Sequence, residues 1–245
     1  MTASDHKFPE DIFWAELLVM SRMRTAAFLR PDTGVAAKPG ATRAWLADIP
    51  VDAQWAPAPT STERHGQYGA QASSWPFSQS PYDGPCCYLQ LNLEEIPADV
   101  RQNEYPSQGV VWVMIDLSGE PGWEACAHYD PRPAESIPWR PRMHDDASTG
   151  MKWHLESIAP DCTEETMPEL VHYPFTYEQW AQEHNRRARK SDIQVGGWIW
   201  PCQGDFDVRN RDFVCGIEHQ TFGDSGAIYL HYNKDRGFYA RVETH

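Results

Sequence analysis

The stretch from Gly109 to Leu117 reads Gly-Val-Val-Trp-Val-Met-Ile-Asp-Leu and is a nearly continuous apolar run. About half of its residues are β-branched, which favours a strand over a helix in a run of this length. The turn-type residues 118–122 follow it directly. A short apolar run between turn signals is typical of a strand that is buried on both faces. We therefore expect a central strand of a β-sheet here.

Further strands are expected on both sides of this run. From Cys87 to Leu93 apolar and polar residues alternate, as they do in a half-buried strand. Residues 123–129 predict a short, weakly marked strand. The last quarter of the chain contains three more apolar runs, at residues 193–201, 213–220 and 227–232, and the second and third of them predict strands.

The last quarter repeats the order of the middle of the chain. An alternating strand, a polar connection, a glycine and an apolar strand occur in both places. Residues 88–91 and 109–112 correspond in this way to residues 215–218 and 226–229. This order predicts an internal duplication of a strand pair. We expect two related, mainly antiparallel sheet units packed with a few helices, in a single globular α+β domain.

Two helices are expected. The first begins at Pro9, runs to about Leu29 and ends at the turn-type residues 31–34. Its apolar positions lie on one stripe: Ile12, Phe13, Leu17, Met20 and Met23. The second begins at Thr176, which forms a capping box with Gln179. Basic residues crowd its carboxyl end, where the helix dipole favours cations: Arg186, Arg187, Arg189 and Lys190.

Two segments lack a regular pattern. Residues 38–81 are rich in Pro, Ala, Ser, Thr and Gly and predict an irregular arm that tryptophans hold to the body. Residues 130–175 are rich in proline and acidic residues and predict a covering loop or connection. We therefore divide the chain into residues 1–81, the first helix with the arm, and residues 82–245, the body.

The charge of the chain excludes several classes of function. The 245 residues include 21 Lys and Arg against 35 Asp and Glu, a formal net charge of −14 at pH 7. Such a surface repels nucleic-acid phosphates and anionic lipids. No apolar run approaches the roughly 20 residues that span a bilayer, and residues 1–7 lack the pattern of a signal peptide. We expect a cytoplasmic protein that binds neither nucleic acid nor membranes.

The cysteines and glycines give no sign of a cofactor. No C-x-x-C occurs among the six cysteines, so reduced, mostly buried thiols are expected rather than a zinc site. Gly196-Gly197 lacks the spacing of a phosphate-binding loop and predicts a bulge or a close backbone approach instead. Residues 223–226, Gly-Asp-Ser-Gly, precede a strand and predict a turn rather than a nucleophile elbow. No cofactor is expected.

The order of these motifs resembles the YwqG-like family of bacterial proteins. The motifs are Trp75-Pro76, residues 88–93 with Ile96-Pro97, residues 109–113, residues 195–197 and residues 223–229. They extend over about residues 75–235, a usual size for one domain. The arm and the acidic middle segment depart from the family. The resemblance implies an α+β fold with repeated sheet units and transfers no established catalytic residues. Some members lie near polymorphic-toxin genes, which implies an immunity role.

No residues form a convincing catalytic or metal site. His144-Asp145-Asp146 offers metal-type ligands, but no ligand motif surrounds it, and an exposed acidic loop is the better interpretation. Glu94 and Glu95 are adjacent on extended chain and point opposite ways, so they cannot act together as acid and base. They predict a turn at the end of a strand.

The main functional hypothesis is an immunity protein that binds and occludes a cognate toxin or effector domain. The negative charge favours a basic partner, and tryptophans beside acidic residues favour a binding patch. The same tryptophans could instead hold long loops in place. The expected partner-binding residues are Trp139, Asp145, Asp146, Trp153, Asp161, Glu164 and Glu165.

The alternative hypothesis is a small-molecule binder or an enzyme. A ligand would lie between the two repeated sheets, where sheet junctions form pockets. Trp198, Trp200 and His219 would line this site, since indole faces suit sugars and nucleobases. A third possibility is a structural or adaptor role in a larger assembly.

Overall fold

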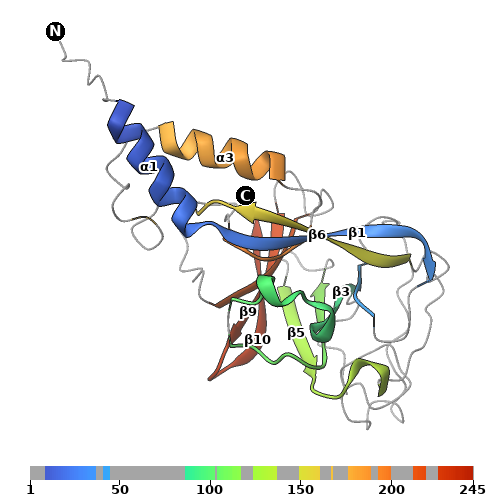
Figure 1. Ribbon diagram of the computed structural model, residues 1–245. Coiled ribbons are helices and arrows are strands. Elements are labelled where there is room, and N and C mark those ends of the chain that lie inside the picture. The colour runs from blue at the N-terminus through green and yellow to red at the C-terminus, as the bar shows by residue number, and fades with distance from the viewer. Residues whose placement is uncertain are drawn as a thin grey trace.

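In the part of the chain that the structure describes, two antiparallel β-sheets and two α-helices are formed (Figure 1). The computed structural model describes residues 9–36, 41–44, 86–102, 104–116, 124–136, 149–160, 167, 176–188, 193–199, 212–218 and 226–244. In these residues no helix is both long and apolar enough to cross a membrane.

The larger sheet has six strands in the order β10-β9-β8-β7-β1-β6. All neighbouring strands that it contains are antiparallel. Their bounds are β1 Arg24–Ala36, β6 Thr149–Ile158, β7 Ile193–Gly196, β8 Phe213–Glu218, β9 Gly226–Asn233 and β10 Gly237–Thr244. The sheet therefore joins β1, from the first part of the chain, to five strands from the second.

The smaller sheet has four strands in the order β2-β3-β4-β5. It also contains only antiparallel pairs. The strands are β2 Arg43–Ala44, β3 Cys86–Asn92, β4 Val110–Asp116 and β5 Glu124–Asp130. Three short 3-10 helices flank them: η1 Leu93–Glu95, η2 Ala98–Val100 and η3 Ala134–Ser136. The strands expected at residues 87–93, 109–117 and 123–129 are confirmed.

The main hydrophobic core lies between the two sheets. One face of the larger sheet supplies Ala27 and Leu29 of β1, and the smaller sheet supplies Leu89, Leu91 and Val111; all are buried. The sheets also meet at their edges, where β10 contacts β5 and β2 contacts β6. At the first of these edges the rings of Tyr129 and Phe238 lie 5.1 Å apart. The two sheets thus form one closed, apolar interior.

The two helices, α1 Pro9–Arg22 and α3 Thr176–Ala188, lie side by side outside the larger sheet (Figure 1). They pack together through Val19 of α1 and Ala181 of α3. The Asn185 side chain joins α3 to the chain after β6, because it accepts from the backbone N–H of Ala159 and donates to its carbonyl, both at 2.9 Å. The side-chain amide of Asn185 thus forms the two hydrogen bonds that a neighbouring strand would otherwise form with the backbone N–H and carbonyl of Ala159.

The first helix is shorter than expected. It ends at Arg22 rather than near Leu29, and β1 begins at Arg24. Ala26 and Phe28 are buried on the outer face of the sheet, and Ala27 and Leu29 on its inner face. In a strand that is buried on both faces, apolar and polar residues do not alternate. The sequence of β1 therefore lacks the strand pattern, and the expected helix extended too far. The turn expected at residues 31–34 lies within β1.

The segment 130–175 is not only a connection, as expected, because it contains β6. This strand pairs with β1 over ten register positions from Arg24↔Ile158 to Ala36↔Thr149. The prolines and acidic residues around it conceal a ten-residue strand. The arm expected over residues 38–81 lies outside the described residues, except residues 41–44, which include β2.

The second helix and the strands expected at residues 213–220 and 227–232 are confirmed, and β10 was not expected. In the described part of the apolar run 193–201, residues 193–196 form β7, and residues 197–199 do not belong to a strand. The strand pairs β3–β4 and β8–β9 are both antiparallel. An internal duplication is not shown by this arrangement and stays a prediction. Glu94 and Glu95 are exposed in η1, directly after β3, as the expected turn requires.

Gly196 and Gly237 both have a positive φ but differ in how closely other residues pack against them. Gly196 has φ +66°, and an added Cβ would lie 2.4 Å from the carbonyl oxygen of Val100. Gly237 has φ +74°, but nothing lies within 4 Å of its added Cβ. We expect Gly237→Ala to cost about 1–2 kcal/mol through backbone strain alone. Gly196→Ala should cost about 1–3 kcal/mol more, through overpacking.

Urea unfolding measures the loss of unfolding free energy in each variant. Both variants share the backbone strain, but only Gly196→Ala places its Cβ against the carbonyl oxygen of Val100. Equal losses of unfolding free energy would show that β7 and η2 are not packed as closely as described.

Candidate functional site

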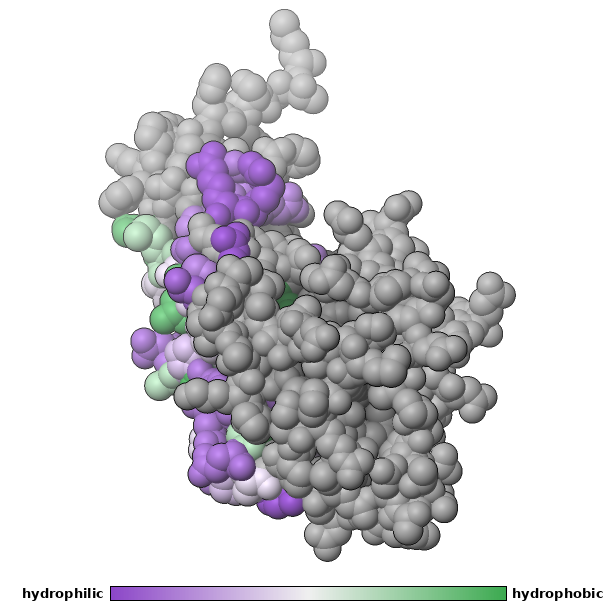
Figure 2. All heavy atoms as spheres, turned by 90° about the vertical axis from the view of Figure 1, so that its right-hand side faces the viewer, coloured by the Kyte–Doolittle hydropathy of each residue, from purple (hydrophilic) through white to green (hydrophobic). Residues whose placement is uncertain are grey.

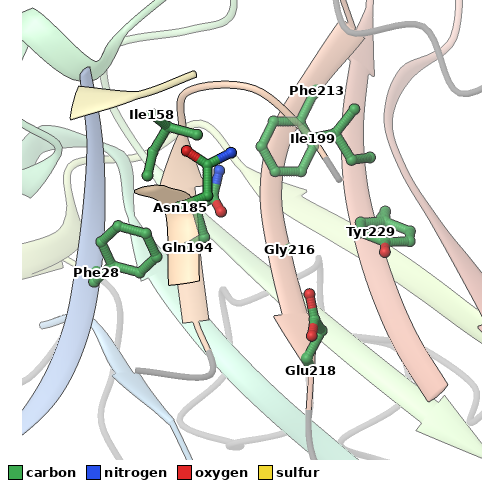
Figure 3. A pocket seen from close by; sticks show the side chains of 9 residues that line it. All are labelled: Phe28, Ile158, Asn185, Gln194, Ile199, Phe213, Gly216, Glu218 and Tyr229. Atoms are coloured by element: carbon green, nitrogen blue, oxygen red, sulfur yellow. The ribbon is translucent and has the colours of Figure 1, made fainter. Parts of the chain in front are cut away.

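A pocket opens on the outer face of the larger sheet, the face turned away from the smaller sheet (Figure 3). Gly216 of β8 lies at its centre, with Glu218 at one end and Phe213 at the other. Its lining residues come from strands, from α3 and from the segment after β7: Phe28, Ile158, Asn185, Gln194, Ile199, Phe213, Gly216, Glu218 and Tyr229. Six different elements, β1, β6, α3, β7, β8 and β9, and one connecting segment therefore build it.

The floor of the pocket is bare backbone. Gly216 pairs with Gln194 of β7 on one side and with Tyr229 of β9 on the other. A Cβ at this position would lie 3.4 Å from the ring of Tyr229 and 3.5 Å from that of Phe213. Those are ordinary contact distances, so the backbone would tolerate a methyl group. The glycine therefore leaves space that other residues would occupy.

Three apolar rings surround this floor. Phe28 of β1 is 1% exposed, and Tyr229 and Phe213 are 2% and 3% exposed. The rings of Phe213 and Tyr229 meet edge to face, with centroids 6.4 Å apart. Because these rings are packed against the sheet, the walls of the pocket are held in place before any ligand binds.

Two polar groups of the pocket are already engaged in the fold. Asn185 uses its amide on the backbone of Ala159, as described above. Gln194 donates from Nε2 to the carbonyls of Gly196 and Trp198, each at 2.9 Å. This leaves Oε1 as the group that Gln194 offers to a ligand. Glu218 adds a partly buried carboxylate. The hydroxyl of Tyr229, which can donate as well as accept, also lines the pocket.

The pocket is small. The space that the centre of a water-sized sphere can reach inside it is about 50 Å³. One water needs roughly 10–15 Å³ by this measure, while drug-sized ligands occupy sites of about 300–1,000 Å³. The pocket can hold a few water molecules or the end of one side chain.

Trp198 supports the pocket from behind. It is 7% exposed and packs with Ala26, Phe28 and Ile158. Its Nε1 donates to the carbonyl of Arg22 at 2.7 Å, at the last residue of α1. The guanidinium carbon of Arg24 lies 3.4 Å from the indole ring centroid, within the range of a cation–π contact. Trp198 is therefore a structural residue next to the pocket.

His231 lies next to the rings of the pocket. Its imidazole is 1% exposed, stacks on Tyr239 at 5.2 Å and contacts Phe213 at 6.3 Å. Among the described residues, neither ring nitrogen has a hydrogen-bond partner. Burial lowers the pKa of His231 to about 4; Arg241 acts in the same direction, and Asp212 opposes it. The folded protein therefore holds this histidine neutral.

The structure describes only some of the expected site residues. Trp153 lies on β6, is partly buried and packs against the core between the sheets. The remaining expected partner-binding residues lie outside the described residues: Trp139, Asp145, Asp146, Asp161, Glu164 and Glu165. Trp200 and His219 of the alternative pocket lie outside them as well. Both expected sets of site residues therefore stay predictions.

The alternative pocket was expected between the two sheets, and the described pocket is not there. Apolar side chains of both sheets fill that space. The pocket lies on the opposite face of the larger sheet instead, and Trp198 borders it without lining it. A single signal could have found it: a glycine between Cys215 and Ile217 in an apolar strand often marks a close approach of a ligand or a neighbouring backbone.

In the described residues no group of three His, Cys, Asp or Glu side chains is placed to hold a metal ion. Cys215 is buried and free, and burial raises the pKa of its thiol. It faces the core between the sheets. This thiol is therefore a core residue, in agreement with the expectation for the cysteines.

No family model matches the chain, and no curated protein is significantly similar to it in sequence. The resemblance to the YwqG-like family accordingly stays a hypothesis that rests on the order of the motifs.

The buried histidine predicts how stability depends on pH. In the unfolded chain the pKa of a histidine is about 6.5, whereas that of His231 is about 4 in the folded protein. Between these values the unfolded chain binds a proton that the folded protein does not. Stability is thus fully present above the unfolded pKa and falls as the pH drops toward the folded one, by up to about 3 kcal/mol.

We expect His231→Phe to remove this part of the dependence. The difference in unfolding free energy between about pH 7 and about pH 4.5 should shrink by roughly 2 kcal/mol. The phenyl ring preserves the stack on Tyr239. Burial also lowers the pKa of His128 to about 4, so His128 makes the same contribution to the pH dependence in the parent and in the variant. Chemical unfolding at both pH values measures the effect, and an unaltered difference would contradict it.

Proposed function

We propose that this protein is a cytoplasmic immunity protein that binds and occludes a basic toxin or effector domain. The observation that carries the proposal is the formal net charge of −14 at pH 7. A field of this sign accelerates the encounter with a cationic partner and disfavours anionic ones. Occlusion by an acidic protein blocks a basic active-site cleft without any chemistry of its own.

The first helix supports a binding role. Trp14, Leu17 and Met20 follow one another at three-residue intervals along α1 and are 48%, 49% and 62% exposed. Residues spaced in this way lie near one another on a helix. The opposite side of α1 packs against the rest of the protein, where Val19 is fully buried against Ala181 of α3. The helix therefore presents a row of apolar side chains to the solvent.

Such a row is unusual on the described surface. Among the residues drawn in colour in Figure 2, hydrophobic ones occupy separate small areas beside hydrophilic ones. Trp and Met are enriched in protein interfaces, and exposed apolar rows mark interaction sites more often than single exposed residues do. The exposed row on α1 and the acidic residues expected in the partner-binding set are the anchors of the proposed interface.

Complex formation tests the proposal. The protein should bind the toxin-type domain encoded beside its gene and rescue cells that express it. The affinity should fall by roughly tenfold or more as salt rises from about 50 to about 500 mM, because rim charges are screened. Calorimetry at both salt concentrations measures this. Absence of both rescue and complex would remove the proposal.

Variants of exposed leucines test the role of α1. Leu17→Ser should weaken the complex about fivefold or more, the loss typical of an interface anchor. Leu155→Ser is the matched control, because Leu155 is 47% exposed but lies on β6. Both variants should unfold at nearly the same denaturant concentration as the parent. Equal affinity of the two variants for the partner would exclude α1 from the interface.

A second candidate function is the binding of a small molecule in the pocket. The volume of about 50 Å³ restricts this candidate to a ligand of a few non-hydrogen atoms. A ligand that binds only the folded protein must raise the unfolding midpoint. Thermal unfolding with panels of metabolites and metal ions therefore tests this candidate, and an unchanged midpoint at saturating concentrations counts against it.

A further inference from the structure

The larger sheet ends at β6. Among the described strands β6 pairs only with β1, so one of its two edges is left over for another strand. We propose that this edge pairs antiparallel with the same edge of a second copy of the chain and forms a symmetric dimer. The dimer goes beyond the proposed function and does not depend on it.

The pairing of β6 with β1 shows which backbone groups point to the outer edge. In an antiparallel pair, facing residues that exchange two hydrogen bonds alternate with facing residues that exchange none. Thr25 faces Ser157. The carbonyl of Thr25 accepts from the side chain of Gln102 at 3.1 Å, and the carbonyl of Ser157 lies 2.9 Å from Nε2 of His184. Both carbonyls therefore point away from the shared ladder, and this pair is of the second kind.

Three further residues of β6 have the same orientation. The register of the two strands continues without a shift as far as residues 32 and 150. Leu155, Trp153 and Met151 therefore also direct their N–H and carbonyl groups away from β1. Pro31, which faces Met151, has no N–H to donate and agrees with this orientation. Within the described residues, no strand or side chain is hydrogen-bonded to the outward groups of these three residues.

The length of the available edge sets the register of the dimer. At one end His184 and Asn185 of α3 already bind backbone groups of residues 157 and 159. At the other end the register of β6 against β1 shifts beyond residue 150. Residues 151–155 remain, and their centre is Trp153. Antiparallel pairing of this segment with its own copy forms six backbone hydrogen bonds, two for each of three facing pairs.

The side chains of this segment are complementary to those of a second copy. Leu155 is 47% exposed, whereas Met151 and Trp153, on the same face of β6, are partly buried against the core. In the proposed register Leu155 of each copy faces Met151 of the other, and the two Trp153 side chains face each other. Apolar and aromatic pairs of this kind stabilise a sheet. The exposed leucine is thereby covered.

The charged residue of the segment also fits this register. Like charges that face each other directly destabilise a strand pair. Lys152, which is exposed, faces His154 of the second copy, so the two lysines do not face each other. An edge of five residues is a small interface, and we expect a weak dimer with a dissociation constant on the order of 10–100 µM.

Association through this edge stops at two copies. The opposite edge of the larger sheet is β10, which packs against β5 of the smaller sheet. Tyr129 and Phe238 meet there with their ring centroids 5.1 Å apart. Of the two edges of the larger sheet, only that of β6 is therefore available in the described structure. A two-fold axis uses this edge in both copies, which closes the assembly.

Sedimentation equilibrium of the parent from about 1 to about 500 µM tests the dimer. The mass should rise from 28.0 kDa toward twice this value. Higher salt should strengthen the association, because it screens the repulsion between two copies that each have a net charge of −14. This response is opposite to that expected of the complex with a basic partner. A parent that remains a monomer throughout this range overturns the inference.

Variants of Leu155 locate the interface. Leu155→Ser should weaken the dimer about fivefold or more, while Leu17→Ser, at a leucine of similar exposure on α1, should leave it unchanged. Leu155→Pro should weaken the dimer by tenfold or more, since it removes an outward N–H from each copy and leaves the ladder with β1 intact. The serine variant keeps the test valid if the proline variant fails to fold. A dimer that Leu155→Ser does not weaken contradicts the proposal.

Disulfide formation between two mixed variants tests the register. Residues 152 and 154 of opposite copies form a pair without hydrogen bonds, whose Cα atoms lie about 4.5 Å apart, within the range of a disulfide. Lys152→Cys mixed with His154→Cys should therefore give a covalent heterodimer under mild oxidation. Lys152→Cys mixed with Ser157→Cys is the control, and the parent alone accounts for the native cysteines. Equal yields from the two mixtures would overturn the inference.

The same variants separate the dimer from the proposed function. Sedimentation and disulfide formation use the chain alone, so their outcome holds whether or not a toxin partner exists. If the parent is a monomer and Leu155→Pro weakens the partner complex, the edge of β6 receives a strand of the partner, and the second copy is excluded. If the dimer forms and no partner complex does, the proposed function fails and the dimer stands.

Discussion

The rest of the structure depends on the burial of β1 on both of its faces. Ala27 and Leu29 enter the core between the sheets, while Ala26 and Phe28 pack with Trp198 on the outer side. The strand pairs with β6 on one edge and β7 on the other, so its backbone groups are satisfied as well. Both faces and both edges of β1 are therefore in contact with other elements. In this way β1 connects the inner core, the helix layer and one wall of the pocket.

That same burial explains which elements the sequence could predict. Strands with one polar side or with many β-branched residues, such as β3 and β4, are recognisable from the chain alone. The segment Arg24–Leu29 contains alanine, leucine and arginine, which favour helices, and has no alternation because both faces are buried. Pairing with β6 overrides its local preference. β6 itself is hidden by the prolines and acidic residues near it in sequence, and it exists because β1 offers an edge.

The candidate site could be predicted less well than the fold, for a physical reason. Its residues come from segments that only the pairing order of the sheet brings together: Phe28 from β1, Asn185 from α3 and Tyr229 from β9. Sequence spacing carries no information about such neighbours. Tryptophan is a common anchor of binding surfaces, yet Trp198 is needed for packing and caps α1 through its indole nitrogen. The residue that creates the space, Gly216, is conspicuous only once its neighbours in β7 and β9 are known.

The side chain of Gln194 links the stability of the fold to the readiness of the pocket. One of its donated hydrogen bonds goes to the carbonyl of Gly196, the last residue of β7, and the other to that of Trp198 just after it. Between these two acceptors the chain turns, and Gly196 and Gly197 have φ +66° and +78°. These bonds hold a turn that approaches Val100 and Ala26 closely, and they also fix the orientation of the remaining acceptor. A ligand group therefore meets an acceptor whose side-chain entropy was already lost on folding. Less entropy is lost on binding, so a small pocket can contribute more to affinity than its area alone implies.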